Sequence, residues 1–499
     1  MHKKYILGLD QGTTGTTALL LDEKWNQKSK GYTEVTQHYP KPGLVEHDGT
    51  ELFETLIASC TKALRNAGAG ADEIKCIGIA NQGETVIAWD KETGIPVYNA
   101  IVWQDKRTAE YVDELNEKYG DLFYMHTGLR LDAYFGATKI SWILQNVDEA
   151  KELLKQKRLL AGTLDTWFIW KLTGGKTYVT DAVTASRTAL MNVEKRCWDK
   201  NILDLLEIPC EILPEIVENA VSFGMTDPDV FFGESVPITA SIVDQQAALI
   251  GQGCFSFGKL KTTYGTGCFM LMNTGENLKR NADGLLSTLA LVHNGIPSYA
   301  LDGGVYIAGA AVNWLKNGLG IIENPKEADV LASSVKDNAG VYFVTAFSGL
   351  SAPYWDPYAR GTVLGVTASC TKAHIVRAAL EATAYQVKDI FDIMCEISGA
   401  EIKSMRCDGG LTNNRFLMQF QADMLNIPVE IPEISESTGL GTAFLAALGA
   451  GEISSLSELS DLCKMKTCYE PRMSNDERLY LVDKWHKAVE IARIRILDD

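Results

Sequence analysis

The sequence contains little of what a membrane protein, a zinc protein or a secreted disulfide protein needs. No apolar run approaches the roughly 18 residues that span a bilayer, and the apolar stretch Tyr5–Leu9 is too short for a signal peptide. The seven histidines show no HxxH or HExxH spacing, which argues against a protein-ligated zinc ion. Eleven cysteines without a CxxC pair predict reduced thiols and a cytoplasmic location.

Positive charge is also scarce. Lysine and arginine number 47 against 64 aspartates and glutamates, so the formal net charge is −17. This balance argues against nucleic-acid and membrane-surface partners. A small anionic ligand such as a phosphate group can still bind, because backbone N–H groups and one or two local cations suffice. No GxGxxG pattern is present, so a dinucleotide site has no support.

What the chain does contain is a globular composition with alternating strand and helix patterns. Of its 499 residues, 46% are hydrophobic and 22% charged, which suits two large domains or three smaller ones. Tyr5–Leu9 and Ile74–Ala80 are apolar strand patterns, and apolar residues from Glu51 to Ala67 recur at helical spacing. This mixture predicts an α/β fold.

Two similar hairpin patterns lie near the starts of the two halves of the chain. Tyr5–Leu21 and Lys259–Met272 each consist of a strand, a Gly-Thr turn and a second strand. The echo favours two related domains that face each other, and the glycines of Gly251–Gly258 place the boundary between residues 1–251 and residues 252–499. Gly-Thr turns are common, so the echo alone leaves an unrelated origin open.

Asp10 and Asp408 open two glycine-rich turns. Asp10 precedes Gly12-Thr13-Thr14, where backbone and hydroxyl donors suit a phosphate group and the carboxylate suits Mg²⁺ bound through water. Asp408-Gly409-Gly410 joins a strand pattern to an apolar helix pattern, and the glycine pair permits close approach of a ligand. An ordinary tight turn is the plainer interpretation of each motif, and the residues alone leave both open.

Asp244 follows the apolar strand pattern Pro237–Val243 and opens a helix pattern. Aspartate is a preferred N-cap, so capping is one interpretation. The other is a general base at the carboxyl end of a strand, where clefts of α/β proteins open and an attacking hydroxyl could lose its proton. The residues alone do not decide between them.

Taken in order, these and further segments resemble the FGGY family of carbohydrate kinases. The matching motifs run through nearly the whole chain: Asp10–Thr14, Tyr39–Gly43, Val45–Asp48, Asn81–Thr85, Tyr98–Gln104, Tyr134–Lys139, Asp244–Ala248, Thr263–Glu276, Ala352–Gly361, Asp408–Gly410 and Phe416–Gln421. So many matches at the right spacing are highly specific, and the plainer interpretations of the single motifs lose most of their weight.

The resemblance implies two actin-like (ribonuclease H-like) α/β domains that face a central cleft. It also implies ATP-dependent phosphorylation of a polyol, with glycerol the leading substrate, with Asp244 as catalytic base and with Asp10 organising Mg²⁺. The implied polyol site comprises Gly83, Glu84, Trp103, Tyr134, Asp244, Gln245 and Phe269. The implied ATP site comprises Thr13, Thr14, Gly15, Thr266, Gly309, Gly410 and Asn414. Kinases of this kind are commonly homo-oligomers, dimers or tetramers.

The chain departs from the family pattern at three places. Gly83 replaces an arginine that normally holds a polyol hydroxyl, and Thr17 replaces another arginine near the phosphates. A phosphorylatable histidine of a bacterial subset is missing, since that stretch reads Val230-Phe-Phe-Gly233. We expect Gly83 to leave space for a larger polyol, a differently placed group or water.

These departures keep two alternative functions open. One is a kinase for another polyol or ketose, such as erythritol, threitol or a pentulose. The other belongs to a different class, an actin-like nucleotide-binding regulatory protein without small-molecule kinase activity.

Overall fold

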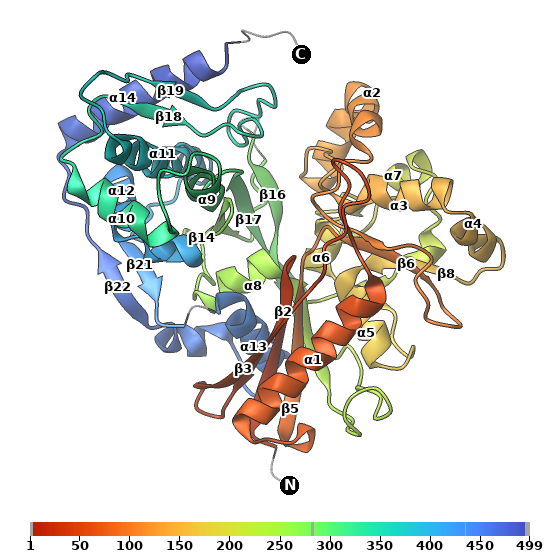
Figure 1. Cartoon of the computed structure of the whole chain (residues 1–499). Coiled ribbons are helices and arrows are strands. Elements are labelled where there is room, and N and C mark those ends of the chain that lie inside the picture. The colour runs from red at the N-terminus through yellow and green to blue at the C-terminus, as the bar shows by residue number, and fades with distance from the viewer. Residues whose placement is uncertain (1–2, 281–283, 435, 495–499) are drawn as a thin grey trace.

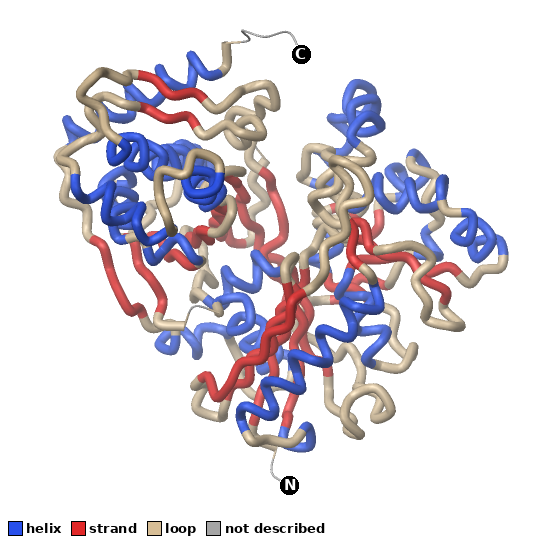
Figure 2. Tube along the Cα trace, in the orientation of Figure 1, coloured by secondary structure: helices blue, strands red, loops and turns tan. Residues whose placement is uncertain are grey.

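The computed structural model describes residues 3–280, 284–434 and 436–494, and it contains two large sheets with helices packed around them (Figures 1 and 2). The first sheet has the strand order β13-β5-β1-β2-β3. Its strands are β1 (Tyr5–Gln11), β2 (Gly15–Leu21), β3 (Gln27–Glu34), β5 (Ile74–Asn81) and β13 (Ile238–Val243). The second sheet has the order β16-β17-β15-β14-β20-β21-β22. Its strands are β14 (Leu260–Tyr264), β15 (Cys268–Gly275), β16 (Leu286–His293), β17 (Ile296–Val305), β20 (Met405–Asp408), β21 (Val429–Pro432) and β22 (Met465–Tyr469).

The two sheets share one topology. In the first, β3-β2-β1 pair antiparallel and β1-β5-β13 pair parallel. In the second, β17-β15-β14 pair antiparallel and β14-β20-β21 pair parallel. Both Gly-Thr hairpins of the sequence are therefore the first hairpins of equivalent sheets. The predicted pair of actin-like α/β domains is confirmed.

The first half contains eight α-helices and further strands besides its large sheet, within the described residues. Helices α1 (Gly49–Ala67), α2 (Ala109–Thr127), α3 (Gly136–Asn146), α4 (Asp148–Lys155), α5 (Leu164–Leu172), α6 (Ala182–Ser186), α7 (Lys200–Leu205) and α8 (Asp244–Gly251) belong to it. A smaller sheet has the order β4-β7-β6-β8, formed by β4 (Glu46–His47), β7 (Ala100–Ile101), β6 (Val86–Asp90) and β8 (Leu159–Thr163). Two short pairs complete the half, β9 (Val179–Asp181) with β12 (Glu215–Val217) and β10 (Met191–Asn192) with β11 (Cys197–Trp198).

The second half contains six α-helices within the described residues and one further strand pair. The helices are α9 (Gly309–Asn317), α10 (Pro325–Ser334), α11 (Lys372–Ser398), α12 (Arg415–Leu425), α13 (Ser437–Gly449) and α14 (Asn475–Ala492). The pair is β18 (Tyr342–Val344) with β19 (Thr362–Leu364). No helix in the described ranges combines the length and the apolarity that a membrane crossing requires.

Helix α1 illustrates how local sequence produces an element. The Asp48 carboxylate accepts hydrogen bonds from the N–H groups of Thr50 (2.7 Å) and Glu51, which starts the helix two residues before the predicted Glu51. Gly68 ends the helix in the left-handed conformation, with φ of 64°. Between them, Leu52 and Leu56 are fully buried within a core shared with the first sheet.

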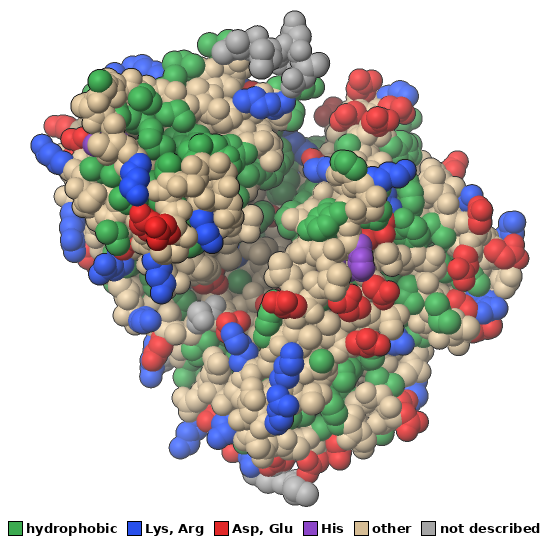
Figure 3. Space-filling model, in the orientation of Figure 1, with side chains coloured by type: hydrophobic (Ala, Val, Ile, Leu, Met, Phe, Trp, Pro, Cys, Tyr) green, Lys and Arg blue, Asp and Glu red, His purple; other side chains and the backbone are tan. Residues whose placement is uncertain are grey.

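Helices α8 and α13 join the two halves at very close range. A Cβ atom at Gly251 of α8 would overlap the carbonyl oxygen of Ser437, and one at Gly441 of α13 would overlap that of Ala247. Only glycine permits this approach. Although α13 follows strands of the second sheet, it also packs on the first sheet, where Gly8 lies against Gly439. The helices that begin at Asp244 and Ser437 therefore start beside a shared interface, below the hollow that Figure 3 shows between the two lobes.

Candidate active site

Trp103 links the predicted polyol residues to the first Gly-Thr turn. Its indole Nε1 donates a hydrogen bond to Thr13 Oγ1 at 2.8 Å, and its ring meets Tyr134 edge-on with centroids 5.5 Å apart. The backbone N–H of Trp103 donates to Thr85 Oγ1, next to Glu84. Aromatic and hydroxyl-bearing side chains thus meet at one place, which suits the carbon skeleton and the hydroxyls of a polyol.

Glu84 is held by an arginine that the sequence analysis did not identify. Arg187 Nε donates to Glu84 Oε1 at 2.7 Å, and Arg187 Nη1 lies 3.0 Å from Asp302 Oδ2 as an ion pair without hydrogen-bond alignment. All three side chains are buried. Asp302 belongs to β17, so this ion-pair chain connects the two halves of the molecule. The sequence signal for Arg187 and Asp302 was a charged residue next to an apolar segment. Neighbouring residues in the sequence did not indicate which partner each charge would have.

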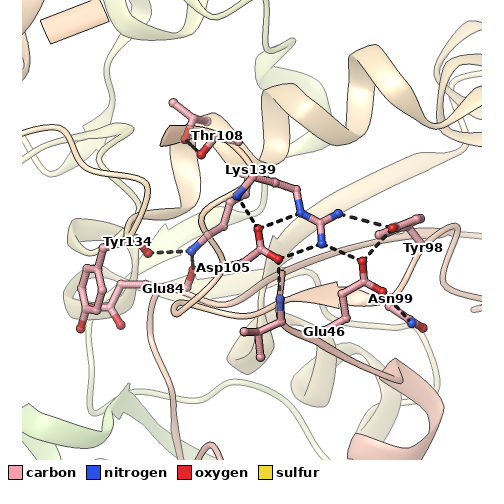
Figure 4. A network of polar contacts seen from close by, with 11 residues as sticks. Glu46, Glu84, Tyr98, Asn99, Asp105, Thr108, Tyr134 and Lys139 are labelled. Carbon is pink, nitrogen blue, oxygen red and sulfur yellow. Dashed lines mark hydrogen bonds and ion pairs between the residues drawn. The ribbon is translucent and has the colours of Figure 1, made fainter. Parts of the chain in front are cut away.

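Lys139 fixes the backbone of two predicted polyol residues. Its Nζ donates to the carbonyl oxygen of Tyr134 at 2.7 Å and to that of Glu84 at 3.4 Å (Figure 4). Burial lowers the pKa of Lys139 to about 7, and the nearby Glu84 and Asp105 partly oppose this shift. The ammonium therefore orders the segments that present the Glu84 and Tyr134 side chains, which lie side by side in Figure 4.

A second buried network supports the segment after Trp103. Arg107 donates from Nη2 to Glu46 Oε1 at 2.6 Å and from Nε to Asp105 Oδ1 at 2.8 Å. The other oxygen of Asp105 accepts from the Val45 N–H at 2.7 Å. Figure 4 shows this network on the other side of Lys139 from Tyr134. These buried, charged hydrogen bonds hold the segment after Trp103 in place.

Asp244 is the first residue of α8 and does not cap it. Val243 occupies the N-cap position, and no side chain caps this helix, so the capping interpretation is wrong. Burial and the neighbouring Glu84 raise the pKa of Asp244 to about 7, against the opposing effect of Lys261. A carboxylate with its pKa near neutrality is suited to accept a proton.

Lys261 is a second cation that the sequence analysis missed. It is fully buried on β14 and donates from Nζ to Gln245 Oε1 at 2.6 Å and to Thr263 Oγ1 at 3.0 Å. Burial lowers its pKa, and Asp408 and Asp244 raise it in turn. The predicted polyol residue Gln245 is thus bound to a lysine of the second half.

Asp10 lies at the end of β1 among other acids. Burial raises its pKa well above the ordinary value, and Asp244, Glu436 and Asp408 raise it further. Asp408 also has a buried oxygen, Oδ1, without a hydrogen-bond partner. Crowded carboxylates with unused oxygens suit a hard cation such as Mg²⁺. In the described ranges no three side chains form a metal-ligating group, so phosphate oxygens and water would have to supply most of the ligands.

The second Gly-Thr turn receives the start of a helix. The N–H groups of Ala308 and Ala310 donate to the Thr266 carbonyl at 2.9 and 3.0 Å, and that of Gly309 donates to the Gly265 carbonyl at 3.1 Å. A Cβ at Gly309 would lie 2.5 Å from the Gly265 oxygen. The predicted ATP residues Thr266 and Gly309 are therefore brought together by backbone contacts.

The remaining predicted residues lie around these turns. Thr14 is exposed in the first turn, which the Gly12 N–H closes onto the Gly15 carbonyl at 3.0 Å. On β15, the partly buried Phe269 ring would be 3.3 Å from a Cβ at Gly304. The last two predicted residues, Gly410 and Asn414, lie after the end of β20.

At the end of β20, the two glycines differ sharply. A Cβ at Gly409, with φ of 91°, would overlap the Tyr264 carbonyl, whereas one at Gly410 would meet no atom within 4 Å. Asn414 caps α12, where its Oδ1 accepts from the Leu417 N–H at 2.9 Å. Gly410 thus offers open backbone, and Asn414 has a structural contact in addition to its predicted role.

The space directly beside Gly83 is occupied, contrary to the expectation from the sequence. A Cβ at this position would lie 2.6 Å from Val243 Cγ2 and 3.0 Å from Cγ1. The valine fills the volume next to the glycine. The expectation of open space is therefore wrong at the position of the first side-chain atom, because a residue far along the chain packs there.

Comparison with known proteins agrees with this geometry. The model of the FGGY family of carbohydrate kinases, N-terminal domain, matches residues 5–251, and its C-terminal domain model matches residues 260–450. Glycerol kinase 2 of Thermotoga maritima is 50% identical over 487 residues, which are 97% of this chain and 98% of that protein. A glycerol kinase of Carboxydothermus hydrogenoformans is 48% identical, with 99% of each chain covered.

A solved structure is similar over the same extent. The crystal structure of Plasmodium falciparum glycerol kinase with ADP superposes with a TM-score of 0.92 at 37% identity, covering 99% of each chain. Together with the two family models, this likeness confirms the resemblance predicted from the motifs. The chain belongs to the FGGY family of carbohydrate kinases.

Proposed function

We propose that this protein transfers the γ-phosphoryl group of ATP to a primary hydroxyl of glycerol, giving glycerol 3-phosphate and ADP. The observation that carries the proposal is the pair of carboxylates Glu84 and Asp244, in which burial first and the neighbouring Glu84 second raise the pKa of Asp244 to about 7. The similarity to glycerol kinases over nearly the whole chain supports the same activity. It does not favour the larger-polyol, ketose or regulatory alternatives.

Asp244 acts as the base in the proposed reaction. Its carboxylate accepts the proton as the substrate oxygen attacks the γ-phosphorus, and the bond to the β,γ-bridging oxygen breaks as ADP leaves. Glu84, oriented by Arg187, accepts a hydrogen bond from another hydroxyl, while Trp103, Tyr134 and Phe269 contact the carbon skeleton. Gln245, whose Oε1 accepts a hydrogen bond from Lys261, would contribute to the same site.

The proposed ATP site uses the two Gly-Thr turns and the β20 end. Thr13, Thr14, Gly15 and Thr266 would donate to phosphate oxygens, and Gly309, Gly410 and Asn414 would lie along the rest of the nucleotide. Mg²⁺ bound beside Asp10 would neutralise phosphate charge, which fits the crowding of carboxylates there. The ADP in the similar Plasmodium structure supports a nucleotide site.

Three further predictions stay proposals. The division into residues 1–251 and 252–499 is supported by the matched family segments. A cytoplasmic location is supported by eleven free cysteines. A homo-oligomer, dimer or tetramer, rests on the family resemblance and is tested by the molar mass in solution.

Steady-state turnover tests the proposed reaction. We expect ADP release from ATP and Mg²⁺ to depend on added glycerol, with a higher kcat/KM for glycerol than for erythritol, threitol, ribitol, xylulose or dihydroxyacetone. Preference for a longer polyol or a ketose would instead support the substrate alternative. Nucleotide binding without turnover on any of them would support the regulatory alternative.

A further inference from the structure

Val243 and Gly83 fit together as a large and a small residue. The two γ-methyl groups of Val243 lie where the first side-chain atom of any other residue at position 83 would be, at 2.6 and 3.0 Å, and even the Val243 Cβ is 3.4 Å away. Val243 is 1% exposed, and Gly83 is buried. A closely packed interior does not relax cheaply around such an overlap. A side chain at position 83 therefore requires Val243 to move.

This contact lies immediately beside the two proposed substrate carboxylates. Gly83 precedes Glu84 in the chain, and Val243 precedes Asp244. Strand β5 ends at Asn81, two residues before Gly83, and pairs in parallel with β13, where Val243 lies opposite Asn81. Any change in the separation of residues 83 and 243 is thus passed directly to Glu84 and Asp244.

We infer that Val243 is a specificity-determining residue that acts as one unit with Gly83. The pair keeps a guanidinium out of position 83, where the family pattern has one, and sets the spacing of Glu84 and Asp244. Glu84 is held from another direction, by Arg187. This inference rests on the proposed glycerol kinase activity and names the residue that tunes its polyol site.

The pair has a chemical consequence for the substrate. An arginine supplies a rigid fork of donors, and a site that bonds a hydroxyl through such donors strongly rejects an analogue without that hydroxyl. With Gly83 and Val243 in place, that fork is missing. 1,2-Propanediol and 1,3-propanediol each lack one hydroxyl of glycerol. We therefore expect this enzyme to discriminate only weakly between glycerol and the diol without the hydroxyl that an arginine at position 83 would bind.

A set of variants separates the pair from each residue alone. Gly83→Arg alone should lower glycerol kcat/KM at least about tenfold, because Val243 blocks the new side chain. Gly83→Arg with Val243→Gly should recover most of that loss and raise the glycerol-to-diol ratio of kcat/KM at least about fivefold over wild type, for the more affected diol. The milder series Gly83→Ala, Val243→Ala and the double variant covers the case in which the arginine variants do not fold. In that series the double variant should be more active than Gly83→Ala.

A glycine with the same kind of crowding serves as the matched control. A Cβ at Gly49 would overlap the Ile87 side chain, so Gly49→Ala should lower the melting temperature without changing the glycerol-to-diol ratio. The inference would be overturned if the single and double variants lost glycerol kcat/KM equally. It would also be overturned if the glycerol-to-diol ratio of kcat/KM changed only in step with the melting temperature. Wild-type enzyme without glycerol-dependent turnover would instead contradict the proposed function, so the two failures are distinguishable.

Discussion

The two halves of the molecule share a strand order but present different groups to the hollow between them. In the first half, the segments after the strands carry the carboxylates Glu84 and Asp244, and the buried Glu84 is held by an ion pair with Arg187. In the second half, the equivalent turns carry glycines whose backbones lie close together, as at Gly309 and Gly409. One sheet topology thus carries functional side chains in one copy and closely packed glycine backbone in the other.

The difference suits the two proposed ligands, since most of the polyol residues lie in the first half, whereas the ATP residues come from the first Gly-Thr turn and from the second half. A small polyol differs from its analogues by single hydroxyls, which side-chain acceptors in a buried site distinguish. Phosphate groups are common to every nucleotide and are well held by successive backbone N–H groups. The first half should therefore be sensitive to the chemistry of its side chains, and the second to added volume at its glycines.

Removing the proposed base should have the largest effect on the side-chain half. Asp244→Asn keeps the shape but cannot accept the proton, so kcat should fall about 10²–10⁴-fold. Steady-state kinetics with a melting curve checks this. A fall below tenfold, in a variant with unchanged thermal stability, would remove Asp244 from the role of base.

Breaking the ion pair between the halves should come next. Arg187→Met leaves Glu84 and Asp302 buried without their cation, a loss worth about 3–5 kcal/mol for a buried pair. We expect a lower melting temperature and a glycerol KM at least about tenfold higher, with a smaller change in the KM for ATP. Equal changes in both KM values would mean that Arg187 supports the whole fold rather than Glu84.

The glycine pair after β20 tests the backbone half. Gly409→Ala places a Cβ against the Tyr264 carbonyl at a positive φ, so stability should fall by more than about 1 kcal/mol. Gly410→Ala meets no protein atom and should leave the melting temperature unchanged while raising the KM for ATP a few-fold. If Gly410→Ala leaves the KM for ATP at the wild-type value, Gly410 does not border the nucleotide.

The smallest expected effect is a shift of the pH profile. Asp244 works as a base only when it is ionised, so with a pKa of about 7 the kcat/KM for glycerol should fall as the pH drops below 7. Glu84 raises this pKa, and Glu84→Gln should therefore move the inflection to lower pH. Glu54→Gln, at an exposed position on α1, is the control that should leave the inflection in place. An inflection that does not move would mean that another group titrates.

Much of the architecture could be predicted, and the site candidates could be named, because their signals are local. The hairpins at Tyr5–Leu21 and Lys259–Met272, the helix at Glu51–Ala67 and the turn after Asp408 each follow from neighbouring residues. Several elements begin at other residues than predicted. For example, β14 begins at Leu260 rather than Lys259, since its pairing with β15 starts there.

By itself the sequence determined the α/β class, the repeated hairpin and the family, because periodicity, turn chemistry and motif order are written in consecutive residues. Only the tertiary structure decided how Glu84 is held and what fills the space at Gly83. Arg187 lies 103 residues from Glu84, and Asp302 comes from the other half. Val243 reaches Gly83 through the pairing of β13 with β5. A buried charge must find a partner and a buried glycine must be packed, but which residue does so depends on how distant strands come together.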